Sequence, residues 1–461
     1  MHIRSFIHER LSELLRSGHA HLSPPRVFLL SFGGLILVGT LGFQLLPGLY
    51  IGAPLSWTDS LFTATSAVCV TGLIVVDTNT YFTPFGQAYI LLLIQAGGIG
   101  FITFTSLIIL LVGQRLSIRQ EQLWRSTAAP GIDYRKLIRS VVLMTFSLEA
   151  IGAGLLYTYW PPEQGHRSLW QAIFHSISAF CNAGFSTYSD SLIQFQKNPL
   201  ILMIISGLIV AGGLGFSTIQ DLSSAARSMA RGQRTHLQVT SKLILTVTLL
   251  LIALGAVGYL LSEWRGAFRE FNLVDKISNA LFMSITARTA GFNSIDYGML
   301  HHRSAFFTIL LMVIGGAPGS MAGGLKVTTV AVIGLMAWSR LLGRSSIRLF
   351  NHSIPEENVQ RAIGLFVLSF GVMTASVLFF STTEFSMTSD PDFLTVMFEV
   401  ASAFNTVGLS MGLTDDLSIA GKLGTVILMF MGRVGPLTFS AAISLRKRSN
   451  IRMARAEVPI G

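Results

Sequence analysis

Long apolar segments separated by short polar ones dominate this chain. Segments of about 20 apolar residues or more can cross a bilayer as helices. Eight segments meet this length, near residues 27–50, 86–113, 140–160, 199–220, 241–262, 304–337, 361–381 and 419–445. The pattern therefore predicts an all-α membrane protein with eight transmembrane helices.

A shorter apolar stretch ending on glycine lies between the two long segments of each successive pair. The four stretches are LFTATSAVCVTG, AIFHSISAFCNAG, ALFMSITARTAG and VMFEVASAFNTVG, which end on Gly72, Gly184, Gly291 and Gly408. Their glycines are 112, 107 and 117 residues apart, so one unit of roughly 110 residues is used four times. Each stretch is too short to span a bilayer, which predicts a re-entrant helix in each repeat.

Four re-entrant stretches in one chain most simply surround one path through the membrane, because non-helical backbone at that depth must be buried or line water. Rings of backbone carbonyls can replace the water shell of a monovalent cation, and glycine allows the turns that aim them. The side chains before the glycines vary while the glycine recurs, which favours coordination by backbone. The sequence thus predicts a selectivity filter formed by Cys69, Val70, Thr71, Gly72, Cys181, Asn182, Ala183, Gly184, Arg288, Thr289, Ala290, Gly291, Asn405, Thr406, Val407 and Gly408.

The second long segment of each repeat carries a glycine cluster. In the first two repeats, AGGIGF and AGGLGF (residues 96–101 and 211–216) indicate close packing of a helix through small residues. The third repeat has five glycines and a proline within ten residues, which cannot remain a regular helix. A helix broken inside the membrane is predicted there, over Gly315, Gly316, Ala317, Pro318, Gly319, Ser320, Met321, Ala322, Gly323 and Gly324.

Charged residues inside the long segments need partners, because an unpaired charge in a membrane is costly. Arg433 falls mid-span in the fourth repeat, where we expect a gate or barrier beside the pore; a structural bond to backbone carbonyls is the alternative. Lys326 follows the broken helix and either anchors it or extends to the membrane surface. Glu149 is expected to form a local contact between helices.

Arg288 lies three residues before the third filter glycine, and Glu399 lies within the fourth re-entrant stretch. Neighbouring repeats could bring the two together behind the filter, where each would offset the other's desolvation. We therefore predict an Arg288–Glu399 ion pair, with Asp77 as a rival partner.

Composition narrows the class of protein further. The chain is 51% hydrophobic and 12% charged, with a mean hydropathy of +0.59, whereas soluble domains carry about 25% charged residues. The net charge of +10 indicates topology rather than nucleic-acid binding, because most of the 33 Lys and Arg residues fall in the segments assigned to the cytoplasm. No catalytic set, zinc spacing or GK[ST] phosphate loop is present, so no enzyme is predicted.

The expected organisation is a cytoplasmic N-terminal segment at residues 1–26, repeats at 27–113, 140–220, 241–337 and 361–445, and a cytoplasmic tail at 446–461. Apolar residues at helical spacing with interspersed arginines predict a short interfacial helix in the first segment. The connections between spans are too short for a nucleotide-binding domain, which would belong to another chain.

The motifs TATSAVCVTGL (63–73), TARTAGFN (286–293), GGAPGSMAGGLK (315–326) and GRVGPLT (432–438) together resemble the Trk/Ktr/HKT superfamily of potassium transporters. Because eight spans fit, the chain is most similar to the KtrB-type membrane subunits. The resemblance implies four helix–pore-loop–helix repeats with pseudo-four-fold symmetry around one pore, and makes the 315–324 run the gating loop beneath the filter. Its implied activity is K⁺ uptake, often Na⁺-stimulated, with no cofactor in the chain.

The same resemblance implies a homodimer in the bacterial inner membrane, with both termini cytoplasmic, and a cytoplasmic ring of nucleotide-binding KtrA-type subunits. A sodium or less selective monovalent cation transporter of the same fold remains the alternative. A secondary transporter with a buried site and a structural membrane subunit also stay open.

Overall fold

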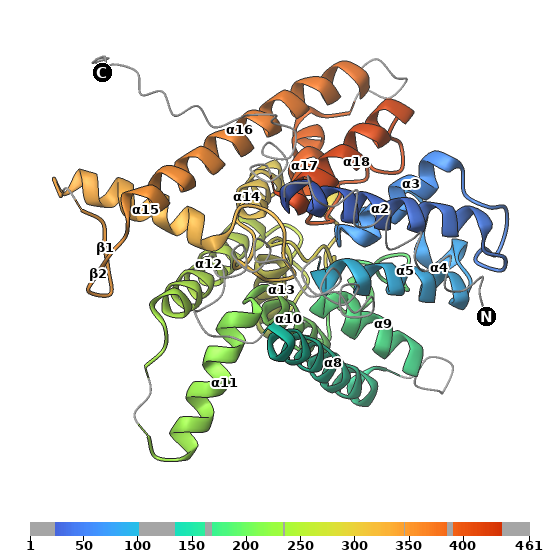
Figure 1. Cartoon of the computed structure of the whole chain (residues 1–461). Helices are drawn as coiled ribbons and strands as arrows, with labels where there is room; N and C mark the ends of the chain where they lie inside the picture. The colour runs from blue at the N-terminus through green and yellow to red at the C-terminus, as the bar shows by residue number, and fades with distance from the viewer. Residues whose placement is uncertain are drawn as a thin grey trace, which may run out of the picture.

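The computed structural model describes residues 24–100, 134–161, 168–233, 236–344, 346–384 and 391–435, and the statements below concern these residues. The predicted N-terminal interfacial helix, the cytoplasmic tail and the ends of the spans 86–113 and 419–445 lie largely or wholly outside them. Helices form almost all of the regular structure, and the groups of helices follow one another around a common centre (Figure 1).

Each repeat contains a long helix, a short helix, an extended segment and a further helix. The first repeat has α2 (Pro24–Leu45), α3 (Trp57–Val68), α4 (Thr78–Tyr81) and α5 (Pro84–Gly98). The second has α8 (Tyr134–Tyr159), α9 (Leu169–Phe180), η1 (Ile193–Phe195), α10 (Pro199–Gly213) and α11 (Phe216–Ala230). The third has α12 (Val239–Glu263), α13 (Leu273–Thr286), η2 (Tyr297–Met299), α14 (His302–Met312) and α15 (Val327–Leu341). A hairpin of β1 (Arg348–Leu349) and β2 (His352–Ser353) precedes the fourth repeat, which has α16 (Glu356–Glu384), α17 (Phe393–Phe404) and α18 (Ile419–Val434).

Several of these helices could cross a membrane. Within the described ranges, the part of α8 from Arg139 to Tyr159, α12 and α16 are long and apolar enough on their own. The pair α10 and α11 also qualifies, but the two helices meet at an angle of 105°. The prediction of eight spans therefore stays a prediction, while the helical membrane character of the chain agrees with the sequence.

The short helices α3, α9, α13 and α17 are the predicted re-entrant elements. They contain 12, 12, 14 and 12 residues, about 18–21 Å at 1.5 Å per residue, against a hydrocarbon core of about 30 Å. The side chains of Ser56, Ser168 and Asn272 cap the first three by accepting a hydrogen bond from a backbone N–H of the first turn. Each helix contains a completely buried phenylalanine at the equivalent position: Phe62, Phe174, Phe282 and Phe398.

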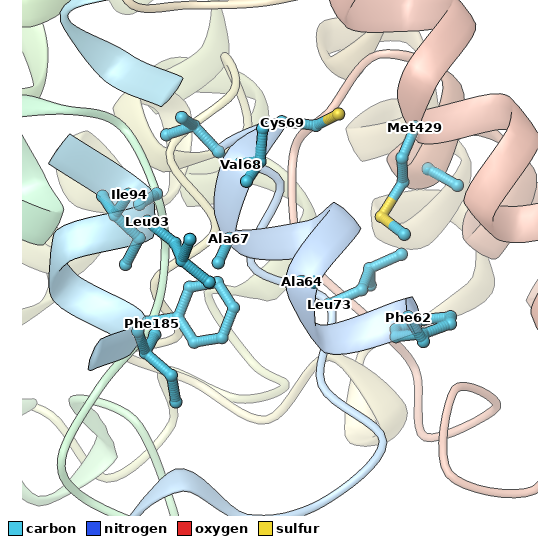
Figure 2. Close-up of a cluster of buried hydrophobic side chains, with 14 of the residues drawn as sticks. Phe62, Ala64, Ala67, Val68, Cys69, Leu73, Leu93, Ile94, Phe185 and Met429 are labelled. Carbon is cyan, nitrogen blue, oxygen red and sulfur yellow. The ribbon is translucent and has the colours of Figure 1, made fainter. Parts of the chain in front are cut away.

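The hydrophobic core surrounds these short helices instead of forming a separate layer. In Figure 2, Ala67 and Val68 of α3 lie near Leu93 and Ile94 of α5. Phe185, from the segment that follows α9, belongs to the same cluster. Each short helix is therefore enclosed by long helices and by a neighbouring repeat, which is how protein can bury a helix that ends at membrane depth.

The glycine clusters of the first two repeats pack closely, as predicted. A Cβ added to Gly97 or Gly212 would lie 1.9 Å from the carbonyl oxygen of Val68 or Phe180, respectively. The interpretation that packing alone explains these clusters is wrong for the second repeat, because its helix breaks there and α11 departs at 105°. Gly215 has φ +81°, a left-handed conformation that cannot continue an α-helix.

The same backbone feature recurs at equivalent positions of other repeats. Helices α5 and α18 end at Gly98 and Val434, and each is followed by a glycine with positive φ: Gly100 (+80°) and Gly435 (+88°). In the third repeat, α14 ends at Met312 and α15 begins at Val327, which confirms the predicted broken helix.

Candidate functional site

The four glycines that end the short apolar stretches meet at one place in the structure. A Cβ added to each would lie within 3.0 Å of the carbonyl oxygen that precedes the glycine of the next repeat: Gly72 on Ala183 (2.4 Å), Gly184 on Ala290 (2.9 Å), Gly291 on Val407 (2.5 Å) and Gly408 on Thr71 (2.1 Å). The fourth repeat thus closes on the first. The resulting ring, called the glycine ring below, places the second and fourth repeats opposite each other.

The backbone of the glycine ring has one conformation in all four repeats. The glycines have φ of +94°, +70°, +82° and +93°. Two residues earlier, a non-glycine residue is also left-handed: Val70 (+55°), Asn182 (+58°), Thr289 (+72°) and Thr406 (+50°). Such residues cost of order 1–3 kcal/mol each and persist where the surroundings impose them, commonly at functional sites. Four equivalent cases make the glycine ring the candidate functional site.

A hydroxyl group behind each ring segment holds this backbone, a feature that the sequence analysis missed. We call this contact the hydroxyl brace. Ser66 donates to the carbonyl of Leu73 (2.6 Å) and accepts from the N–H of Gly72 (3.1 Å). Ser178 donates to the carbonyl of Phe185 (2.8 Å), Thr286 donates to that of Phe292 (2.9 Å), and Ser402 accepts from the N–H of Gly408 (3.0 Å). The hydroxyl lies six residues before the glycine, or five in the third repeat, which is one residue shorter. A serine or threonine at this fixed distance before each glycine was the feature of the sequence that could have predicted the contact.

Some side-chain oxygens of the glycine ring have no protein partner. The hydroxyls of Thr71, Thr289 and Thr406 are buried and make no hydrogen bond within the part of the chain that the structure describes. Buried polar atoms are normally paired with protein or water. These three oxygens are therefore available to water or to a cation.

The segment between α14 and α15, which contains the predicted gating loop, packs against the helix break of the second repeat. Ala317 donates its N–H to the carbonyl of Gly213 (2.9 Å) and Met321 to that of Gly212 (3.1 Å). In return, Phe216 donates to Gly319 (3.4 Å). The break at Gly215 thus frees carbonyl and N–H groups of the helix, and the loop forms hydrogen bonds with them. The start and end of the loop are joined by a hydrogen bond from the N–H of Gly315 to the carbonyl of Leu325 (2.9 Å).

The loop also lies directly against the fourth ring segment. A Cβ added to Gly323 would lie 1.9 Å from the hydroxyl oxygen of Thr406 and 2.9 Å from the carbonyl oxygen of Asn405. One added to Gly324 would lie 3.2 Å from the side-chain oxygen of Asn405. This approach explains why the loop has glycine at these two positions.

Two basic side chains hold the loop. Arg433 of α18 donates to the carbonyl of Met321 and, at 3.1 Å, to that of Gly97 in α5. Lys326 donates to the carbonyl of Ala322 (2.7 Å), a contact that corresponds to the loop-anchoring interpretation of this residue. Arg433 therefore joins the first, third and fourth repeats through backbone carbonyls, the acceptors named as the alternative in the sequence analysis.

The predicted ion pair between Arg288 and Glu399 is wrong. The guanidinium of Arg288 donates at long distance to the carbonyls of Thr248 (3.5 Å) and Gly315 (3.4 Å), while Glu399 accepts from two hydroxyl groups of its own repeat. The rival, Asp77, caps α4 instead. Sequence spacing places a residue along a short helix but does not identify the backbone that approaches it. Here that backbone comes from other elements of the third repeat, and the Nε of Arg288 has no partner in the described chain.

Glu149 forms the predicted contact between helices, since its carboxylate accepts from the side chain of Gln95 (3.0 Å). Another polar contact joins the first and fourth repeats, where Lys422 and Asp59 form an ion pair of 2.7 Å at the first turns of α18 and α3. Nearby, burial and the carboxylate of Asp416 raise the pKa of Asp415, whereas Lys422 lowers it. The ion pair was not anticipated from sequence.

Comparison with known proteins places the chain in context. The family model TrkH, described as a cation transport protein, matches residues 42–451. The chain is 38% identical over 447 residues to the Ktr system potassium uptake protein B of Bacillus subtilis, covering 95% of this chain and 97% of that protein. It is 36% identical over 447 residues to the potassium/sodium uptake protein NtpJ of Enterococcus hirae, covering 95% and 96%. The solved structure of the potassium transporter TrkH from Vibrio parahaemolyticus has the same fold, with a TM-score of 0.73 over 93% of this chain and 86% of that one, at 20% identity.

Proposed function

Because the chain belongs to the TrkH/Ktr family of cation transport proteins, we propose that it takes up potassium ions across the cytoplasmic membrane through a pore at the glycine ring. Its relatives are membrane ion transporters and not enzymes. The observation that carries the proposal is the closed ring of contacts from Gly72 through Gly184 and Gly291 to Gly408 and back to Thr71. Four strained backbone segments that contact one another in a closed ring are explained if all four line one pore axis.

The chemistry of the glycine ring suits a large monovalent cation. Its donors are backbone carbonyls and the unpartnered hydroxyl oxygens of Thr71, Thr289 and Thr406, and neutral oxygens replace the hydration shell of K⁺ without holding the ion too tightly to leave. Every glycine is required sterically, because a Cβ would meet the carbonyl oxygen of the neighbouring repeat. The filter proposed from the sequence, residues 69–72, 181–184, 288–291 and 405–408, coincides with these segments.

We propose that the loop Gly315–Gly324 gates this pore. Its contact with Asn405 and Thr406 supports a position next to the filter, and its bonds to Arg433 and to the second repeat support an ordered, closed position. Because α15 follows immediately after Lys326, movement of that helix would pull on the loop. Opening would break the bonds of the loop to Gly212, Gly213 and Arg433 and would leave the helices on either side intact.

The wider arrangement is proposed on the same basis. Eight transmembrane helices would form four pore-loop repeats at residues 27–113, 140–220, 241–337 and 361–445, with both termini cytoplasmic. Two copies of the chain would form a homodimer and would bind a cytoplasmic nucleotide-sensing ring of KtrA type, which moves the gate. Na⁺ would act as an activator, and the chain would need no cofactor of its own.

Transport of sodium, or of monovalent cations with little discrimination, is the second candidate. The similarity to NtpJ, a potassium/sodium uptake protein that is 36% identical to this chain, favours it. A carbonyl ring discriminates between K⁺ and Na⁺ by the geometry and number of its oxygens, so two relatives with the same fold can differ in preference.

Flux into liposomes that contain the purified chain tests both candidates. We expect K⁺ uptake above that of protein-free liposomes, faster with the regulatory partner than without it, and rescue of a cell deficient in potassium uptake. A larger Na⁺ than K⁺ flux would establish the second candidate. Absence of any cation flux, with and without the partner, would refute both.

A further inference from the structure

In the second and fourth repeats, a side chain of the short helix is joined to the segment beyond the glycine. The residue nine positions before the glycine contacts the serine two positions after it. These pairs are His175 with Ser186 (Nε2 to Oγ, 2.9 Å) and Glu399 with Ser410 (Oε2 to Oγ, 2.8 Å). We call this contact the strut. It adds to the hydroxyl brace that all four repeats share.

The side chains of both struts are buried and hydrogen-bonded. The Nδ1 atom of His175 faces the carbonyl of Gln171 at 2.8 Å; a carbonyl only accepts, so Nδ1 carries a hydrogen. In the neutral tautomer Nε2 then accepts from the hydroxyl of Ser186, whose oxygen also lies 3.3 Å from the carbonyl of Ser191. The second carboxylate oxygen of Glu399 accepts from Thr414. His175 is 0% exposed and Glu399 1%.

The resemblance between the two struts extends one step further along the chain. The oxygen of Ser186 accepts from the N–H of Tyr188 and that of Ser410 from the N–H of Gly412, both at 3.1 Å. In each case the serine fixes the turn that leaves the glycine ring. Two unlike side chains, an imidazole and a carboxylate, thus support the same turn at the same register.

The first and third repeats are built differently. In the first, the position nine before the glycine is Thr63, whose hydroxyl is buried without a hydrogen-bond partner in the described chain, and the position two after is Ile74. In the third, which is one residue shorter, the equivalent position is the buried Met283, eight before the glycine. Asn293, two after the glycine, is bonded through its backbone to Ser191 and Leu192 of the second repeat. The struts therefore belong to two opposite members of the glycine ring.

A strut at this place acts on the strained part of the backbone. Strained left-handed residues persist only where surrounding contacts over-determine them, and each strut connects the elements on both sides of the strained segment. We propose that His175 and Glu399 are positioning residues that hold the second and fourth filter segments at the width K⁺ requires, so that cation preference depends more on this opposed pair than on the other two repeats. The proposal rests on the glycine ring being the ion filter.

Kinetic constants for K⁺ and Na⁺ uptake into liposomes test it. We expect His175→Leu and Glu399→Leu each to raise the KM for K⁺ about tenfold, the equivalent of about 1.4 kcal/mol and of one hydrogen bond to a buried group. The KM for Na⁺ and the maximal rate should change less. His175→Gln and Glu399→Gln keep an acceptor oxygen and should recover most of the K⁺ preference. Thr63→Val is the matched control, at the same register in a repeat without a strut, and should behave like the wild type.

The control variants also keep the test decisive. If a leucine variant does not elute as a folded protein in detergent, Ser186→Ala and Ser410→Ala remove the same contact with a smaller change and should shift the KM ratio in the same direction. A wild-type ratio of the two KM values in every folded variant, or an equal shift in Thr63→Val, would refute the proposed role of the struts in cation preference and leave the proposed function intact. Wild-type liposomes that take up no K⁺ would instead overturn the proposed function.

Discussion

Replacing Gly408 by serine is the most direct test of the glycine ring. Gly408 has φ +93°, and a Cβ at this position would lie 2.1 Å from the carbonyl oxygen of Thr71. Real Cβ atoms essentially never approach another heavy atom within 3.0 Å, so one of the two groups must move by at least 3.0 − 2.1 = 0.9 Å. Either movement displaces a ring oxygen or the segment that carries it.

The energetic cost follows from the same geometry. A side chain in the left-handed region costs about 1–2 kcal/mol, to which the displacement of the Thr71 carbonyl adds. If this strain is relieved at the expense of ion coordination, K⁺ affinity should fall about 5- to 30-fold, since 1.4 kcal/mol is a factor of ten. Na⁺ uptake should fall less, so that the variant admits relatively more sodium.

The KM values for K⁺ and Na⁺ uptake into liposomes measure this effect. Gly48→Ser is the control, because Gly48 has φ +76° but no atom within 4 Å of an added Cβ. It should reduce thermal stability without changing cation preference. A folded Gly408→Ser protein with the wild-type ratio of KM values, or an equal change in Gly48→Ser, would show that the glycine ring is not the filter.

The other ring glycines extend the test to a graded series. The added Cβ would lie 2.1 Å from the facing carbonyl at Gly408, 2.4 Å at Gly72, 2.5 Å at Gly291 and 2.9 Å at Gly184. The loss of K⁺ affinity in the four serine variants should follow this order, with Gly184→Ser the mildest. An order unrelated to these distances would argue against the steric explanation.

Further predictions concern contacts between repeats. Arg433→Ala removes the donors to the proposed gate and should raise flux by the chain alone and weaken its dependence on the regulatory partner; an unchanged flux in a folded variant would contradict the gate. Arg288→Gln and Glu399→Leu should have additive effects on transport, since the two side chains have separate partners, and a strong coupling in the double-mutant cycle would show that they interact. Lys422→Met, which leaves Asp59 unpaired at side-chain exposures of 17% and 23%, should lower the free energy of unfolding by about 1–2 kcal/mol, and a wild-type melting temperature in detergent would show that the pair contributes little.

The helix breaks show how far local sequence can be trusted. Five glycines and a proline over residues 315–324 predict a broken helix by composition alone, and α14 and α15 are separated there. The motifs AGGIGF and AGGLGF are nearly identical and fit either a packed helix or a break. Positive φ recurs at Gly100, Gly215 and Gly435. The 105° bend after α10, and the third-repeat loop that bonds to the backbone freed there, appear only in the tertiary structure.

The sequence by itself determined the repeat, the apolar segments, the four glycines and the family motifs. These are local properties, because hydrophobic length selects what can enter a bilayer and glycine alone tolerates certain backbone angles. Tertiary structure decided which residues meet. It set Gly408 against Thr71 and Lys422 against Asp59, 363 positions earlier in the chain, and it gave Arg288 carbonyl partners instead of Glu399. Such contacts depend on how four helical repeats close into a ring, and closure is a property of packing that no short stretch of sequence encodes.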